Sequence, residues 1–221
     1  MRKIWSSLLV AFVLFGCSDT PVGNEESLYQ GHLLVSWEFN NATEIGYDNT
    51  NGGNTALVGD GSPSIEKNTL LLDGASGLYL PASDTLGSKD FALEVKVFPK
   101  EFSSMMNIIT TEPPGTYGDG WILRLENNTL YFLIRDGGND YDWIKYKISS
   151  IDKDKWSKIL VECFQDSIKA YINDEMVLNE FYSGDASSLD YQWGIGYDAT
   201  HQEINNRYFN GKIDYIRYYE L

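Results

Sequence analysis

The sequence has few residues of the kinds that build disulfides and thiol chemistry, since its 221 residues include only two cysteines. Cys17 lies in an N-terminal segment with the features of an export signal. Cys163 is then the one cysteine of the remaining chain, which excludes an intramolecular disulfide there. It alternates with Ile159 and Val161, a pattern that predicts a small buried strand residue rather than a reactive thiol.

Motifs for common catalytic sites are missing as well. The chain has no Gly-x-Ser-x-Gly, no phosphate-binding glycine loop and no paired Cys or His at zinc spacing. Its two histidines, His32 and His201, lack the neighbours of a general base. These absences argue against histidine-based, zinc-based and nucleotide-dependent catalysis.

Basic residues are scarce, with 17 Lys and Arg against 32 Asp and Glu, for a net charge of −15. Residues 1–16 contain Arg2, Lys3 and no acid, so their removal leaves 15 basic and 32 acidic residues, a net charge of −17. Such a surface repels nucleic acid and anionic lipid headgroups. Cations and neutral glycans remain compatible partners.

No apolar run near the N-terminus is long enough to span a bilayer, because the stretch 4–15 is short and follows two basic residues. Its Leu-Phe-Gly-Cys ending resembles a bacterial lipoprotein signal. We therefore predict a signal peptide at 1–16, a lipidated Cys17, a polar tether over 17–30 and one domain over 31–221. The protein would then lie in the cell envelope, at the outer membrane or cell surface, contacting the membrane through its lipid anchor only. An ordinary secretory signal, with Cys17 incidental, is the alternative.

Strand-like alternation recurs along the rest of the chain, and helical periodicity is absent. In 91–97, Phe91 and every second residue are apolar, whereas Ala92, Glu94 and Lys96 form the face expected to be wet. Segments 121–126 and 130–135 alternate in the same way around Asn127–Asn128, which predicts a hairpin. The pattern indicates an antiparallel sandwich.

The order of short motifs resembles the laminin G-like, concanavalin A-like lectin/glucanase domain. The C-terminal third has a strand led by Trp156, a Tyr-x-Asn at Tyr171, a Gly-Ile-Gly from Gly194 and a Gly-x-Ile-Asp ending at Asp214. The N-terminal part adds Phe39, the loop 48–54, the Leu-x-x-Asp-Gly motif at 70–74 and Pro81. The resemblance implies an all-β, two-sheet jelly-roll sandwich across the domain.

This resemblance implies binding more often than catalysis. Related glucanases place two acids in a Glu-x-Asp-x-x-Glu motif, because retaining hydrolysis needs carboxyl groups about 5 Å apart. No Glu-x-Asp occurs in this chain. We therefore predict a non-catalytic module that binds carbohydrate. A protein-binding adhesion or assembly module is the alternative, followed by a divergent glycoside hydrolase or polysaccharide lyase.

A structural Ca²⁺ is predicted beside the closing strand. Strict alternation would place Asp214 on the core side with Ile216 and Tyr218, where a carboxylate needs a partner. Relatives often bind Ca²⁺ near this residue and the N-terminal loop, which implies Asp48 and Asn51 as further ligands. The alternative is that Asp214 accepts backbone N–H groups or pairs with an arginine.

Fifteen Tyr and six Trp exceed what a core of this size needs, so some should be exposed. Aromatic faces bind the apolar side of sugars, and polar groups bind the hydroxyls. The residues that we predict to contact a glycan follow the hairpin and its neighbouring loops: Trp143, Tyr141, Tyr131, Arg124, Arg135 and Tyr117. The acidic loop 136–142 is interpreted as a solvated hairpin tip. Trp37, Trp121 and Trp156 are expected to be structural.

Overall fold

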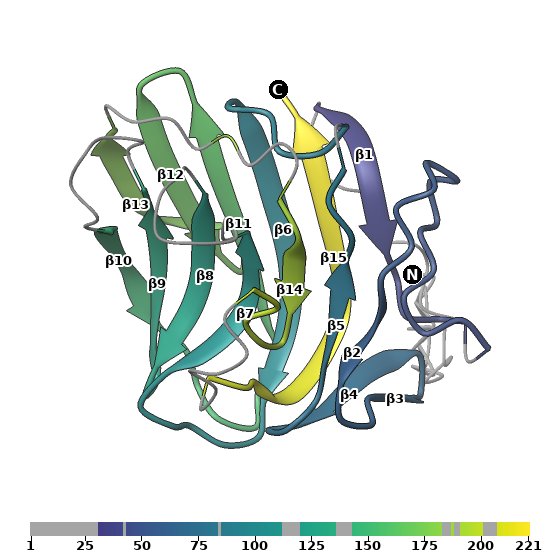
Figure 1. Ribbon diagram of the computed structural model, residues 1–221. Coiled ribbons are helices and arrows are strands. Elements are labelled where there is room, and N and C mark those ends of the chain that lie inside the picture. Colours follow the sequence, from purple (N-terminus) through teal and green to yellow (C-terminus); the bar gives the residue numbers. More distant parts are fainter. Residues whose placement is uncertain are drawn as a thin grey trace, which may run out of the picture. The chain divides into compact units, whose positions relative to one another are not determined.

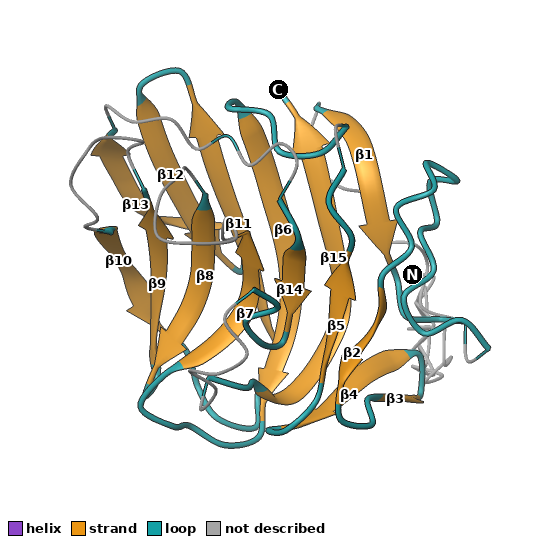
Figure 2. Ribbon diagram, in the orientation of Figure 1, coloured by secondary structure: helices purple, strands orange, loops and turns teal. Residues whose placement is uncertain are grey.

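A computed structural model describes residues 31–41, 43–83, 85–111, 120–135, 143–182, 187, 191–200 and 207–221. Residues Gly31–Leu221 form one compact unit. Its described residues fold into strands and loops, and none of them belongs to a helix capable of crossing a membrane. Figure 2 shows this all-strand architecture.

Two antiparallel sheets pack face to face (Figure 1). The eight-stranded sheet has the order β13 (Glu175–Phe181), β12 (Ser167–Ile172), β11 (Ser157–Phe164), β6 (Phe91–Pro99), β15 (Asn210–Glu220), β4 (Thr69–Asp73) and β3 (Ser64–Glu66), with β1 (His32–Trp37) paired to β15. The seven-stranded sheet has the order β10 (Ile144–Ser150), β9 (Thr129–Ile134), β8 (Trp121–Glu126), β7 (Met106–Thr111), β14 (Trp193–Ile195), β5 (Gly77–Leu80) and β2 (Leu57–Asp60). The predicted two-sheet antiparallel sandwich is confirmed.

Aromatic rings from both sheets meet at the centre of the core. Trp121 is fully buried, and its ring centroid lies 5.3 Å from Phe91 and 5.9 Å from Phe132. Trp193 packs edge-on against Trp121 at 5.3 Å and against Tyr218 at 5.0 Å. Offset and edge-to-face contacts of this kind add to the free energy gained by burying the rings. The cluster joins the two sheets.

The predicted hairpin is confirmed, because β8 and β9 pair across Asn127 and Asn128 with Glu126 opposite Thr129. Asn127 adopts a positive φ of 53°, a conformation that asparagine tolerates better than most residues. The inward-facing residues of both strands are buried as expected. Cys163 is buried too, and burial raises the pKa of its thiol well above the usual value, with Asp90 adding to the effect.

The outer face of β6, expected to be exposed to solvent, is instead mostly buried. Ala92 is fully buried and Glu94 is 3% exposed, because β6 is a central strand flanked by β11 and β15. Arg217 of β15 lies opposite Glu94 and donates to its Oε1 at 3.3 Å. An ion pair therefore occupies a place where alternation predicted solvent.

Trp156 is more exposed than the other two tryptophans expected to be structural. Trp37 and Trp121 are buried, as predicted for structural residues, but Trp156 is 38% exposed. Its ring centroid lies 5.3 Å from Phe98, and the Lys96 ammonium lies 5.9 Å from its ring. Trp156 precedes β11 and lies outside the core.

Candidate functional site

Most of the predicted glycan contacts that the structure describes lie on the outer face of the seven-stranded sheet. Arg124 of β8 is opposite Tyr131 of β9, and both alternate with core residues of their strands. Arg135 directly follows β9, and Trp143 directly precedes β10, whose Ile144 pairs with Ile134. Strand pairing thus brings these four residues to one face.

Arg124 is built into this sheet. It is 6% exposed, and its Nε donates to Asn107 Oδ1 at 2.8 Å. Asn107 of β7 is itself fully buried. A charged guanidinium at such depth needs hydrogen-bonding partners, and this one binds the neighbouring strand. Arg124 therefore links β7 to β8.

The more exposed part of the face consists of two aromatic rings, each with a cation above it. The Arg135 guanidinium lies 4.6 Å from the centre of the Trp143 ring, and the Lys145 ammonium lies 4.0 Å from that of Tyr131. Lys145 also forms an ion pair with Glu126. Cation–π contacts of this kind fix ring orientation. We call Tyr131, Arg135, Trp143 and Lys145 the β9–β10 platform.

Tyr117, Tyr141, the acidic loop 136–142 and His201 lie outside the described residues, as do Cys17 and its flanking segments. His32 begins β1 and is exposed.

Asp48 is 1% exposed and holds the loop after β1 in place. Its Oδ1 accepts hydrogen bonds from Ser36 N at 3.2 Å, Thr50 N at 3.0 Å and Thr50 Oγ1 at 2.7 Å. Its Oδ2 accepts one from Asn54 N at 3.1 Å. The indole N–H of Trp37 donates to Asn54 O at 2.9 Å. These bonds tie the loop to β1 and to the core.

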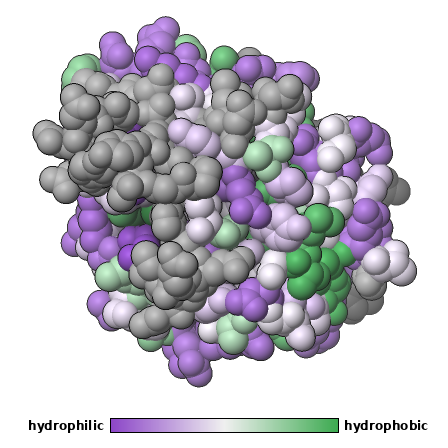
Figure 3. All heavy atoms as spheres, in the orientation of Figure 1, coloured by the Kyte–Doolittle hydropathy of each residue, from purple (hydrophilic) through white to green (hydrophobic). Residues whose placement is uncertain are grey.

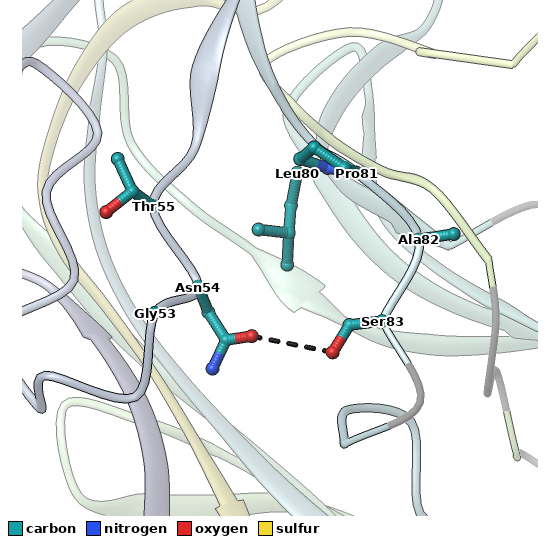
Figure 4. A pocket seen from close by; sticks show the side chains of 7 residues that line it. All are labelled: Gly53, Asn54, Thr55, Leu80, Pro81, Ala82 and Ser83. Atoms are coloured by element: carbon teal, nitrogen blue, oxygen red, sulfur yellow. Dashed lines mark hydrogen bonds between the residues drawn. The ribbon is translucent and has the colours of Figure 1, made fainter.

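A pocket of about 430 Å³ lies against this loop, between Gly53–Thr55 and Leu80–Ser83 (Figure 4). Asn54 and Ser83 point toward one another across it, and Ser83 Oγ donates to Asn54 Oδ1 at 3.5 Å. Neither residue was predicted from the sequence to belong to a site. Asn54 ends the predicted Gly- and Asn-rich loop, but only the fold brings Ser83 beside it.

Asp214 does not lie on the core side, which corrects the expectation from strict alternation. The register of β15 shifts between Ile213 and Tyr215, so this bulge reverses the direction of the residue between them. The Asp214 carboxylate is 31% exposed and lies 3.0 Å from Lys96 Nζ. An ion pair with arginine was the alternative predicted for Asp214 in place of a metal. The structure shows an ion pair with lysine.

The three predicted Ca²⁺ ligands thus each have a partner within the protein, since Asn51 Oδ1 accepts a hydrogen bond from the Tyr47 hydroxyl at 2.9 Å. Within the described part of the chain, no three His, Cys, Asp or Glu side chains are grouped to hold an ion. Calcium near Asp48, Asn51 and Asp214 stays a prediction.

A family model of the concanavalin A-like lectin/glucanases superfamily (Laminin G 3) matches residues 72–221. The chain belongs to this family. A search of curated proteins found no match. The jelly-roll sandwich predicted from the motif order agrees with this assignment.

Solved structures of similar fold include domain 4 of AbnA, a GH43 extracellular arabinanase from Geobacillus stearothermophilus, in complex with arabinotriose. It is 17% identical, with a TM-score of 0.66 over 86% of this chain and 93% of that domain. The binding domain of botulinum neurotoxin DC in complex with rat synaptotagmin II is 14% identical, with a TM-score of 0.60 over 86% of this chain. A botulinum neurotoxin type C structure, described as interacting with two ganglioside molecules, is 13% identical, with a TM-score of 0.61 over the same share. This chain spans about half of each toxin chain (48%). At these identities the likeness shows the fold.

Proposed function

We propose that this protein is a non-catalytic carbohydrate-binding lipoprotein of the cell envelope, and that the β9–β10 platform contacts the glycan. The observation that carries the proposal is the pair of aromatic rings on one face of the sheet, each with a cation over one side of the ring. Membership in a lectin/glucanase family supports it, as do similar folds whose structures hold arabinotriose or engage gangliosides. Fold alone does not fix function, so the proposal depends on the platform.

The chemistry of the platform suits a sugar. Aromatic rings bind the C–H surface of a pyranose or furanose, and planar guanidinium groups donate hydrogen bonds to hydroxyl oxygens. Arg135 both stacks on Trp143 and carries such donors. The net charge of −15 disfavours polyanionic glycans, which makes neutral glycans the preferred class.

Trp143→Ala should weaken glycan binding about fivefold or more, because a ring stacked on a ligand contributes about 1–3 kcal/mol in platforms that bind nucleic-acid bases. The fold should persist, since Trp143 lies at a strand end outside the core cluster. A glycan array would identify the ligand, and titration would give the affinities. Trp156→Ala is the matched control, because Trp156 is also partly exposed and lies near a lysine but is on the other sheet. Equal affinities for Trp143→Ala and the unchanged protein would reject the platform.

Anchoring through Cys17 has its own test. Cys17→Ser should abolish fatty-acid labelling and move the protein from the detergent phase to the aqueous phase on partitioning, because stable anchoring requires the acyl chains. If the unchanged protein already partitions into the aqueous phase, residues 1–16 act as an ordinary secretory signal instead.

A protein partner is the second candidate, and the edge strand β2 favours it. Leu57 and Val58 are 45% and 51% exposed, and β2 is the last strand of its sheet. Figure 3 shows apolar side chains gathered where this strand lies. An edge strand with exposed apolar side chains can accept a further strand. If Val58→Lys abolishes binding of a protein partner and Trp143→Ala leaves that binding unchanged, the result would favour a protein-binding function.

A further inference from the structure

Another pocket, of about 530 Å³, opens where β4 and β6 end and β7 and β15 begin. These strand ends lie toward the bottom of Figure 1. Pairing of β15 with β4 sets Asn210 opposite Asp73. The residues that matter for its chemistry are Asp73, Glu101, Phe102, Tyr208 and Asn210. The volume lies within the range of about 300–1,000 Å³ typical of ligand pockets.

The Tyr208 ring is held in a fixed position at this pocket. It stacks on Tyr197, with centroids 5.9 Å apart and an angle of 11° between the rings. Its hydroxyl donates to Asp60 Oδ2. Burial, followed by Asp60, raises the pKa of Tyr208 to about 12. The ring therefore stays neutral and oriented, with one face covered by Tyr197.

Tyr197 is fixed in turn by two glycines. A Cβ at Gly59 would lie 1.9 Å from the Tyr197 hydroxyl oxygen, and one at Gly77 would lie 2.4 Å from its ring. Only glycine at both positions leaves a slot for this ring. Tyr208 thus packs on a rigid support. Its side chain is already ordered, which lowers the conformational-entropy cost of binding a ligand.

Acceptor oxygens surround the aromatic side of the pocket. Asp73 Oδ1 accepts hydrogen bonds from Ser76 Oγ at 2.7 Å and from Ala75 N at 3.0 Å, and these bonds lower the pKa of Asp73. They leave Oδ2 for a ligand. Glu101 Oε2 accepts from Asn210 Nδ2 at 3.4 Å, which leaves Glu101 Oε1 and Asn210 Oδ1 as further acceptors.

We infer that this pocket binds a residue of a neutral sugar, with hydroxyls donating to Asp73 and Glu101 and the C–H surface against Tyr208 and Phe102. The two carboxylates disfavour anionic sugars. No residue of the β9–β10 platform lines this pocket. Arg135 bonds to Gly120 beside Thr111, at the end of β7 away from Met106, whereas Tyr131 lies two strands from β7 at the level of Asn107. The pocket therefore uses different residues from the platform and would give the protein two glycan contacts.

Residue-resolved NMR of the purified protein tests the inference. The probes are arabinose, glucose, galactose and mannose at millimolar concentration, with glucuronate as the anionic control. We expect the neutral sugars to shift the amide signals of Gly74 and Ala75, with binding about tenfold weaker in Tyr208→Ala and in Asn210→Ala. Tyr208→Phe keeps the ring but loses the Asp60 bond that orients it, so its binding should fall between that of Tyr208→Ala and that of the unchanged protein. Trp143→Ala should leave the pocket shifts intact.

Shifts confined to the Trp143 indole would overturn the pocket and support the platform. The absence of any shift at Gly74 and Ala75 with all four neutral sugars would also overturn the inference about the pocket. The glycan array would still test the platform separately. Equal shifts with glucuronate would overturn the assignment to neutral sugars. If either alanine variant loses the dispersed spectrum of a folded protein, Glu101→Gln, at an exposed position, gives the same test.

Discussion

Asp48→Ala should lower the free energy of unfolding by about 3–5 kcal/mol, one of the two largest effects that we expect. The buried carboxylate accepts bonds from the backbone N–H groups of Ser36, Thr50 and Asn54. Alanine would leave these mostly buried donors without their acceptor, and each unsatisfied buried donor costs about 1–3 kcal/mol. Urea unfolding followed by tryptophan fluorescence would measure the change.

Two further variants sharpen this result. Asp48→Asn keeps one acceptor oxygen and should lose less than the alanine variant. Asn51→Gly is the control within the same loop, because Asn51 is exposed, glycine accepts its positive φ of 62°, and its side chain bonds Tyr47 alone among the described partners. We expect a change of at most about 0.5 kcal/mol there. A loss as large as that of Asp48→Ala would mean that the whole loop, rather than the carboxylate, sets stability.

Chelation distinguishes the contribution of the Asp48 hydrogen bonds to stability from that of a bound metal. If the predicted Ca²⁺ is bound, EDTA should lower the melting midpoint of the calcium-loaded protein and leave that of Asp48→Ala unchanged. An unchanged midpoint in both proteins contradicts the Ca²⁺ prediction. The hydrogen bonds would then account for the whole effect of Asp48.

Arg217→Met should also cost about 3–5 kcal/mol, because it leaves the buried Glu94 carboxylate without its cation. The Arg217 side chain is 11% exposed and contacts Glu38 at 2.8 Å and Glu94 at 3.3 Å. Burial alone would lower the pKa of Arg217, but hydrogen bonding and charge from Glu38 raise it, with smaller contributions from Tyr219 and Glu94. The guanidinium is therefore firmly charged. Chemical denaturation would measure the loss.

The double variant Arg217→Met with Glu94→Gln tests this explanation, because removing both charges should recover much of the lost stability. Lys155→Met is the surface control. Its ion pair with Asp152 is 71% and 70% exposed, so its removal should not change the unfolding midpoint measurably. A double variant no more stable than Arg217→Met would show that lost packing, not the stranded charge, causes the effect.

Much of the fold was predictable from residues alone. Alternation in 91–97 and 121–135 located β6, β8 and β9 and gave the core side of each. Short or irregular strands were harder to predict: β2, β3 and β7 were not anticipated, and the Ser167 segment contains two strands, β12 and β13, joined at Asn173–Asp174. β2 and β3 have four and three residues, too few to show a period, and β7 is buried on both faces, so its residues do not alternate.

The site was less predictable than the fold. The sequence indicated that Tyr131 and Arg135 would share one face, and β8–β9 pairing explains why. It did not indicate that Arg124 would be buried against Asn107, because that contact depends on a third strand. Asp73, Tyr208 and Asn210 carry no local signature of a pocket, and pairing of β4 with β15 brings two of them together.

The sequence by itself therefore determined the sheet class, the order of most strands along the chain and the inward face of the strands that alternate regularly, because these follow from a two-residue period that is local. The tertiary structure decided which outward residues meet solvent. Glu94 is buried, Trp156 is exposed and Asp214 faces Lys96 because strand neighbours and one bulge in β15 set their surroundings. These are contacts between residues distant in the chain, and no local pattern records them.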